Sequence, residues 1–137
     1  MSGPDQRHAV EVARDVVHRL PPGEPPRTVI AAALLHDVGK VESRLGTFAR
    51  VGVTLAAMAA GRAKLLGWAQ RATPRQRQSL RRRVGLYLAH DQVGAELLEA
   101  AGSEPLTSTW AREHHLPAER WSVERRFATA LKAADDD

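Results

Sequence analysis

The chain has 137 residues, the length of one domain whose core is large enough to fold without disulfides or a structural metal. Hydrophobic residues make up 43% of it and charged residues 26%, a composition that excludes the apolar-poor, highly charged class of disordered proteins. The absence of cysteine excludes disulfides, thiolate zinc sites and cysteine nucleophiles, and the formal net charge of +4 comes mostly from arginine.

The composition of the chain and the spacing of its apolar residues predict helices throughout. Ala, Leu, Arg and Glu dominate, and apolar residues recur every three or four positions, so the expected fold class is all-α. The expected helices cover residues 5–20, 28–39, 46–70, 75–90, 91–102, 103–115 and 122–135.

Residues that commonly cap helices set the expected helix ends. Two glycines are expected to close helices, because glycine readily takes the left-handed conformation: Gly39 and Gly102. A break is expected at Thr73-Pro74. Four residues are expected as N-caps: Thr28, Asp91, Ser103 and Ser122.

The hydropathy of the chain favours a soluble protein. The first seven residues lack the apolar core of a secretion signal. The apolar stretch 51–60 is too short to span a bilayer. We therefore expect a cytoplasmic protein.

His36 and Asp37 close the apolar run 29–35 and are followed by Val38, Gly39 and Lys40. An imidazole and a carboxylate in a largely buried helix must be hydrogen-bonded or bound, because burying them bare costs roughly several kcal/mol. A metal ion would meet that need. Imidazole with carboxylate suits iron, manganese or zinc, and carboxylate alone suits magnesium or manganese.

Other potential ligands share this setting. Five of the six histidines lie near a predicted helix end or on an apolar helical face, whereas His18 lies among charged residues and is interpreted as a surface residue. With the two aspartates, the candidate ligands are His8, His36, Asp37, His90, His114, His115 and Asp135.

The segments that carry these residues resemble the HD superfamily of metal-dependent phosphohydrolases over nearly the whole chain. They are 7–13 with His8, 33–40 with His36-Asp37, 88–98 with His90, 112–115 with the paired histidines, and 130–135 with Asp135. The resemblance implies an all-α HD-domain bundle over residues 1–137, with a basic and apolar helical insertion at about 44–85. It also implies one or two divalent ions (Fe, Mn, Mg or Zn).

Two departures limit the resemblance. The Gly-Tyr-Pro tripeptide is absent, which argues against a cyclic-dinucleotide phosphodiesterase of the HD-GYP branch. Pro4 stands where some three-metal members carry a glutamate, so at most two metals are expected.

The resemblance implies a role for each site residue. Asp37 would bridge two cations, with His8, His36 and Asp135 completing one site and His90 with His114 or His115 completing the other. Two such cations make hydroxide available and neutralise the phosphoryl oxygens. Lys40 would act on a substrate phosphate as a point charge, although a plain surface lysine is an equal alternative.

An arginine run is the remaining feature, with members at positions 71, 75, 77, 81, 82 and 83. It is interpreted as a solvated face first and as a contact to an anionic membrane second. Nucleic acid ranks below both, because no aromatic residues interleave with the arginines. Three functions follow: a phosphohydrolase acting on a nucleotide-like or other small phosphate ester, a catalytically weak regulatory domain that binds metal and phosphate, or a membrane-surface protein.

Overall fold

The structure is a computed structural model that describes residues 3–43, 45, 47–71 and 80–137. All regular elements of this part of the chain are helices, so the all-α, single-domain prediction is confirmed. They are α1 (Gly3–Arg19), α2 (Arg27–Leu35), α3 (Lys40–Ser43), α4 (Thr47–Ala60), α5 (Arg62–Gln70), α6 (Leu80–Leu88), α7 (His90–Ala100), α8 (Pro105–Glu113), a short 3₁₀ helix (Ala118–Arg120) and α9 (Arg125–Asp136).

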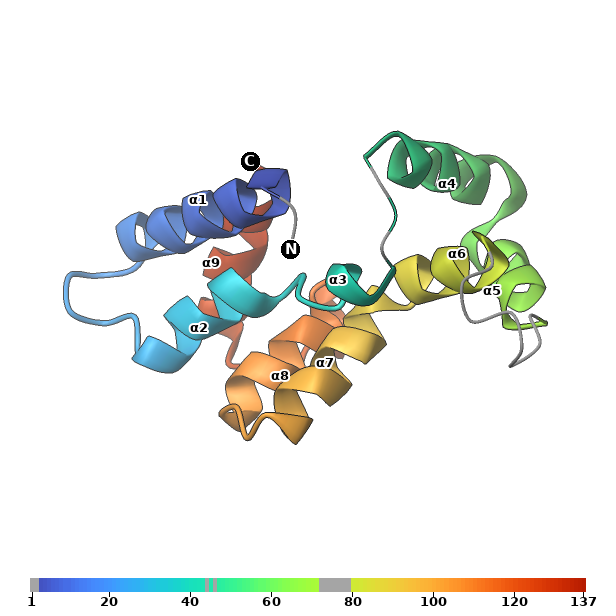
Figure 1. The fold of residues 1–137 in the computed structure, drawn as a ribbon. Coiled ribbons are helices and arrows are strands. Elements are labelled where there is room, and N and C mark those ends of the chain that lie inside the picture. Colours follow the sequence, from blue (N-terminus) through green and yellow to red (C-terminus); the bar gives the residue numbers. More distant parts are fainter. Residues whose placement is uncertain (1–2, 44, 46, 72–79) are drawn as a thin grey trace.

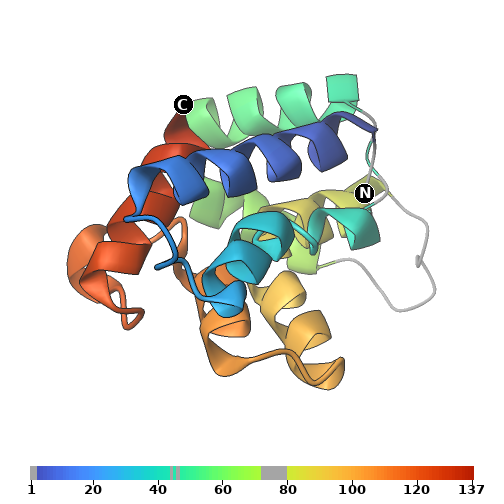
Figure 2. The same ribbon diagram turned by 90° about the vertical axis from the view of Figure 1, so that its left-hand side faces the viewer.

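The helices form two groups that meet at α3. Helices α1, α2 and α9 pack together, and α2 also packs on α8, which pairs with α7 (Figure 1). Helices α4, α5 and α6 lie on the other side, and α3 contacts both α6 and α7. The first and last helices of the chain, α1 and α9, pack side by side (Figure 2).

Separate apolar cores hold the two groups. The larger core joins α1, α2, α8 and α9 around fully buried side chains such as Val16, Val29, Trp110 and Leu131. A second core lies within the region 45–88 and consists of Leu45, Val53, Ala69, Val84 and Leu88. The segment between α3 and α7 therefore packs mainly on its own apolar residues.

The predicted N-caps are wrong by one to two residues, and two of them, Ser122 and Asp91, have partners elsewhere in the fold. The observed N-caps are Pro26, Ala89, Glu104 and Glu124 in place of Thr28, Asp91, Ser103 and Ser122. Both the backbone N–H and the hydroxyl of Ser122 donate to the Glu113 carboxylate, at 2.7 and 2.6 Å. Asp91 accepts a hydrogen bond from Arg62 at 3.3 Å. For α8, Pro105 fixes the first helical turn, so the residue directly before it becomes the cap.

Glycine conformations correct two further boundaries. Helix α2 ends at Leu35 instead of Gly39, and residues 36–39 form turns before α3. Gly39 has no positive φ, whereas Gly102 does (72°), as expected for a helix end. Gly61, with φ 89°, divides the single helix expected over 46–70 into α4 and α5. Thr73-Pro74 and the expected helix start at Arg75 lie outside the described residues.

None of the helices in the described ranges combines the length and apolar character needed to cross a bilayer.

Candidate metal centre

All seven candidate ligands come together at the junction of the two helix groups. They come from α1, from the turn after α2, from the start of α7, from the end of α8 and from α9. Their ring nitrogens and carboxylate oxygens form two neighbouring sets that meet at Asp37. We call these the first subsite (His8, His36, Asp37 and Asp135) and the second subsite (His90, His114 and His115 with Asp37).

The first subsite links the two ends of the chain. Oδ1 of Asp135 lies 3.2 Å from Nε2 of His8 and 3.1 Å from Nε2 of His36. Oδ2 of Asp37 lies 3.6 Å from the same His36 nitrogen. One ligand atom each from His8, His36 and Asp37 fall within 4.8 Å of one another.

The second subsite lies on the other side of the Asp37 carboxylate. Oδ1 of Asp37 is 3.3 Å from Nε2 of His90 and 3.8 Å from Nε2 of His114. The Nε2 atoms of His90 and His115 lie 3.1 Å apart. The three histidines offer ring nitrogens that all fall within 4.8 Å of one another. Asp37 thus turns one oxygen towards each subsite.

These spacings fit a shared cation. Two ligands bound about 2.1 Å from one ion lie about 3.0 to 3.4 Å apart at right-angle or tetrahedral geometry. The His8–Asp135, His36–Asp135 and Asp37–His90 separations of 3.1 to 3.3 Å fall within that range, and the Asp37–His36 and Asp37–His114 separations of 3.6 and 3.8 Å are slightly longer. The donor set of imidazoles and carboxylates suits iron, manganese or zinc.

Backbone carbonyls fix the orientation of three histidine rings. Nδ1 of His36 donates to the Ala33 carbonyl at 2.8 Å, and His90 and His114 make the same contact three residues back, at 2.7 and 2.9 Å. A carbonyl can only accept, so the proton sits on Nδ1. Nε2 of each ring is therefore directed into the centre, where the neutral form offers its lone pair, as in a metal-ligating histidine.

Burial leaves several polar atoms of the centre without hydrogen-bond partners. His36 and His114 are almost fully buried, and so is Asp37. Among the described residues, His36 Nε2, His114 Nε2 and Asp37 Oδ1 are buried atoms with no hydrogen bond. Such atoms are unfavourable unless a ligand satisfies them, and a divalent cation would.

The electrostatics keep the carboxylates ionised. Burial alone raises the pKa of Asp37, but His90, His36 and Lys40 outweigh it and hold the pKa well below the usual range. Burial likewise raises the pKa of Asp135, and the contact with His36 outweighs it and lowers the pKa. Burial lowers the pKa of His36, but Asp135 and Asp37 raise it above the ordinary value.

In the second subsite, His114 and His115 are kept neutral. Burial, followed by the charges of His115 and His36, lowers the pKa of His114 to about 3. Burial and the neighbouring His90 lower the pKa of His115 to about 4. At neutral pH both rings therefore carry a lone pair that a cation can bind without displacing a proton.

Lys40 brings a cationic group to the centre. Its ammonium contacts Oδ2 of Asp37, on the side of the carboxylate that faces the first subsite. The side chain is 22% exposed, so it is anchored at the centre while retaining access to solvent.

Gly39 positions Asp37 by close packing on α7. An ideal Cβ at Gly39 would lie 2.0 Å from the His90 carbonyl oxygen and 2.6 Å from the backbone nitrogen of Gly94. No side chain fits there. The glycine expected as a helix stop instead lets the turn that carries Asp37 touch the backbone of the helix that carries His90.

Sequence reasoning missed the residues that support and flank the centre. Tyr87 supplies the carbonyl to His90 and stacks its ring on that imidazole, with centroids 5.9 Å apart. Arg50 forms an ion pair with Asp5 at 2.7 and 2.9 Å. Tyr87 could have been found from the sequence because it stands three residues before the candidate ligand His90. The partners Asp5 and Arg50 stand 45 residues apart, and no local pattern joins them.

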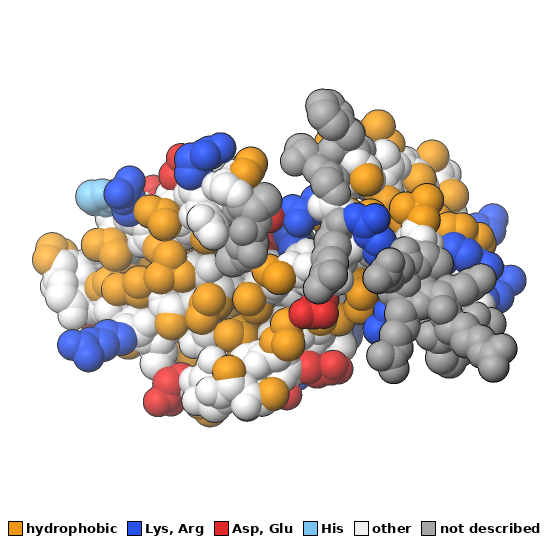
Figure 3. Space-filling model, viewed as in Figure 1, with side chains coloured by type: hydrophobic (Ala, Val, Ile, Leu, Met, Phe, Trp, Pro, Cys, Tyr) orange, Lys and Arg blue, Asp and Glu red, His pale blue; other side chains and the backbone are white. Residues whose placement is uncertain are grey.

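Described members of the arginine run make structural contacts. Arg81 stacks over the Trp68 ring at 4.8 Å and donates to the Trp68 carbonyl, and Arg83 donates to the Ser43 carbonyl. Hydrophobic side chains also appear on the surface of this region, with Lys and Arg beside them (Figure 3). Arg75 and Arg77 lie outside the described residues. His18 is exposed, as expected.

Comparisons with known proteins find no family model, no curated protein and no solved structure that matches this chain.

Proposed function

We propose that the chain is a metal-dependent phosphohydrolase of the HD superfamily that hydrolyses a phosphate ester of a nucleotide-like or other small molecule. One observation carries the proposal: the two oxygens of Asp37 face different histidine sets, Oδ2 towards His36 at 3.6 Å and Oδ1 towards His90 at 3.3 Å. A buried carboxylate in that position suits the bridging of two cations.

The residues divide between two cations as follows. His8, His36 and Asp135 would hold one with Asp37, and the second subsite would hold the other. Mn²⁺, Fe²⁺, Zn²⁺ and Mg²⁺ are the candidate ions. When bound, such ions supply positive charge to phosphoryl oxygens and acidify water at neutral pH.

The chain's own groups prepare this chemistry. The Ala33, Tyr87 and Ala111 carbonyls orient three imidazoles before any ligand arrives, so little side-chain freedom is lost on binding. Lys40 lies beside Asp37 and would place its ammonium on a phosphoryl oxygen. Burial of the centre strengthens each of these electrostatic contacts.

Metal analysis combined with a phosphoesterase assay tests the proposal. Protein purified without chelator should contain manganese, iron, zinc or magnesium and, with manganese added, hydrolyse phosphate monoesters. Asp37→Ala should lose most of the bound metal and at least about a hundredfold in kcat/KM, because it removes a ligand of both subsites. Asp15→Ala is the matched control, since Asp15 is a partly exposed aspartate that pairs with Arg19 on α1.

The outcomes separate the alternatives. Metal retained with no turnover on any phosphate ester would favour the regulatory domain that binds metal and phosphate. Absence of metal from the wild-type protein under all loading conditions would contradict both functions.

A further inference from the structure

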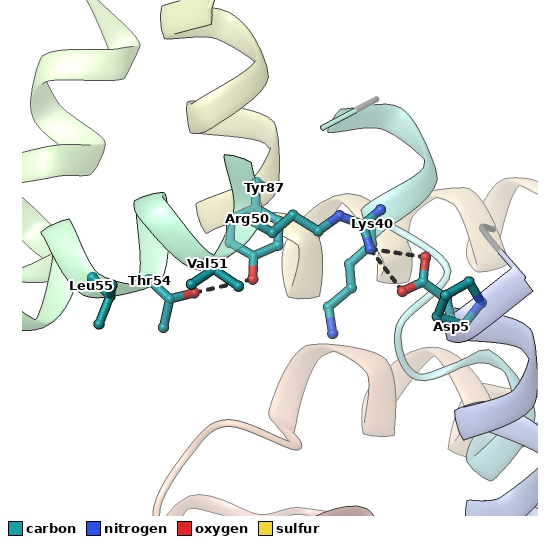
Figure 4. A pocket seen from close by; sticks show the side chains of 8 residues that line it. Asp5, Lys40, Arg50, Val51, Thr54, Leu55 and Tyr87 are labelled. Atoms are coloured by element: carbon teal, nitrogen blue, oxygen red, sulfur yellow. Dashed lines mark hydrogen bonds and ion pairs between the residues drawn. The ribbon is translucent and has the colours of Figure 1, made fainter. Parts of the chain in front are cut away.

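A cavity of about 330 Å³ lies beside the candidate metal centre. Its walls are the first turn of α1, Lys40 at the start of α3, one face of α4, and Tyr87 of α6 (Figure 4). Two of these residues also touch the centre, because Lys40 contacts Asp37 and the Tyr87 ring stacks on His90. A molecule in the cavity would therefore border the Asp37 side of the centre.

One end of the cavity is cationic. Arg50 reaches from α4 to Asp5, and its Nη1 donates to both carboxylate oxygens at 2.7 and 2.9 Å (Figure 4). Its Nε is a buried donor with no acceptor among the described residues. Arg50 and Lys40 thus bring two cations to the cavity wall, where Arg50 is paired with Asp5 and Lys40 with Asp37 of the metal centre. A doubly charged phosphoryl group suits such an arrangement.

The other end is apolar and carries two hydroxyl groups. Val51 and Leu55, one helical turn apart on α4, line the cavity and are 53% and 60% exposed. The Thr54 and Tyr87 hydroxyl oxygens lie 3.3 Å apart beside them (Figure 4). This end has no charged lining residue in the described part of the chain. An uncharged, mainly apolar group would cover Val51 and Leu55 and could hydrogen-bond to the hydroxyls.

We propose that α4 selects the substrate, and that the substrate is a phosphate monoester whose alcohol is uncharged, mainly apolar and about the size of one aromatic ring. The inference rests on the proposed phosphohydrolase function and adds the substrate class to it. The phosphoryl group faces Lys40 and Arg50, and the alcohol lies over Val51 and Leu55. The volume is at the small end of ligand pockets and suits a small monoester better than a polymeric or dinucleotide substrate.

Phosphonates test the cavity without turnover, because their P–C bond is not hydrolysed. Binding of phenylphosphonate and methylphosphonate to the manganese-loaded full chain is measured by calorimetry. Phenylphosphonate should bind at least tenfold more tightly than methylphosphonate. Leu55→Ser should reduce that ratio at least threefold, whereas Arg50→Gln should weaken both ligands and leave the ratio unchanged.

Met58→Ser is the matched control, since Met58 is 79% exposed on the same helix and does not line the cavity. It should leave the ratio unchanged, and thermal unfolding should show that all variants fold. A wild-type ratio near one, a ratio that Leu55→Ser does not alter, or no binding of either phosphonate would overturn the inference.

Hydrolysis of phenyl phosphate and glycerol phosphate is measured separately. If both are hydrolysed while the phosphonate ratio is near one, the substrate class is overturned and the phosphohydrolase stands. If neither is hydrolysed while the ratio and its loss in Leu55→Ser are as expected, the cavity's ligand class is supported and the hydrolytic function is overturned.

Discussion

Each oriented histidine of the centre satisfies a helix end with one ring nitrogen and faces the centre with the other. The carbonyls of Ala33, Tyr87 and Ala111 belong to the last turns of α2, α6 and α8, where backbone carbonyls have no partner further along the helix. The imidazole three residues later donates a hydrogen bond to that carbonyl through its Nδ1–H. Helix termination and ligand orientation are therefore the same contact, which explains why these histidines stand at helix ends.

The low pKa of His114 predicts an acid-sensitive metal-free protein. The native pKa is about 3 against about 6.5 in the unfolded chain, so this group's contribution is complete above pH 6.5 and is lost as the pH falls towards 3. Within that window, protonation of His114 alone lowers the free energy of unfolding by about 1.4 kcal/mol for each unit by which the pH falls. Urea unfolding with chelator between pH 5 and 6 measures this slope.

Between about pH 4 and 6.5, the pH dependence of stability comes largely from the histidines of the second subsite, because the other groups with shifted pKa values titrate outside this range. The lowered pKa values of Asp37 and Asp135 act below about pH 4, and the raised pKa of His36 acts above about pH 6.5. His115, with a pKa of about 4, contributes in the same direction as His114. His114→Gln should therefore reduce the slope of the free energy of unfolding against pH by about 1.4 kcal/mol per pH unit, which corresponds to one proton. An unchanged slope would contradict the neutral, buried state of His114.

At the scale of elements, local patterns located the helices but not their exact ends. Apolar periodicity and the Pro and Gly stops predicted where helices lie, because these signals act within one turn. Two of the predicted caps failed because their side chains bind tertiary partners: Ser122 donates to Glu113, and Asp91 accepts from Arg62. The seven residues of the centre were predictable because their segments resemble a known family pattern. The cavity beside the centre was not predictable, because it depends on Arg50 and Asp5, which only the fold brings together.

The contact of the Asp37 turn with α7 predicts a large effect of one methyl group. Gly39→Ala should lower the free energy of unfolding by about 1–3 kcal/mol, because its Cβ would overlap the His90 carbonyl and the Gly94 backbone. It should also weaken metal binding, since Asp37 and His90 must separate. Gly94→Ala should have a smaller effect, with its nearest neighbour at 3.1 Å. Chemical unfolding and metal titration measure both.

Gly52→Ala provides the comparison. Gly52 lies inside α4 with open space around its Cβ position, so alanine should stabilise the protein by about 0.5–1 kcal/mol through helix propensity. A Gly39→Ala protein as stable as the wild type would show that the turn and α7 are not in close contact.

At the scale of the whole molecule, the centre joins parts of the chain that fold around different cores. His8 and Asp135 stand 127 residues apart and meet because α1 packs beside α9. His90, by contrast, begins α7, next to the region 45–88 with its own core. The ligands come from five separate elements and meet only in the folded state, so metal binding and folding should be linked.

That linkage predicts that metal raises the stability of the protein and that removing the exposed His8 reduces this gain. At a metal concentration 100 times the dissociation constant, manganese should raise the free energy of unfolding by about 2.7 kcal/mol. The His8 side chain is 43% exposed, so His8→Ala should change the metal-free stability little. It should remove about 1.4 kcal/mol of the metal-dependent gain for each tenfold loss of affinity. His18→Ala, which removes an exposed histidine from the same helix, should keep the full gain. Thermal and urea unfolding with manganese or chelator measure these differences, and an equal manganese effect in both variants would exclude His8 from the centre.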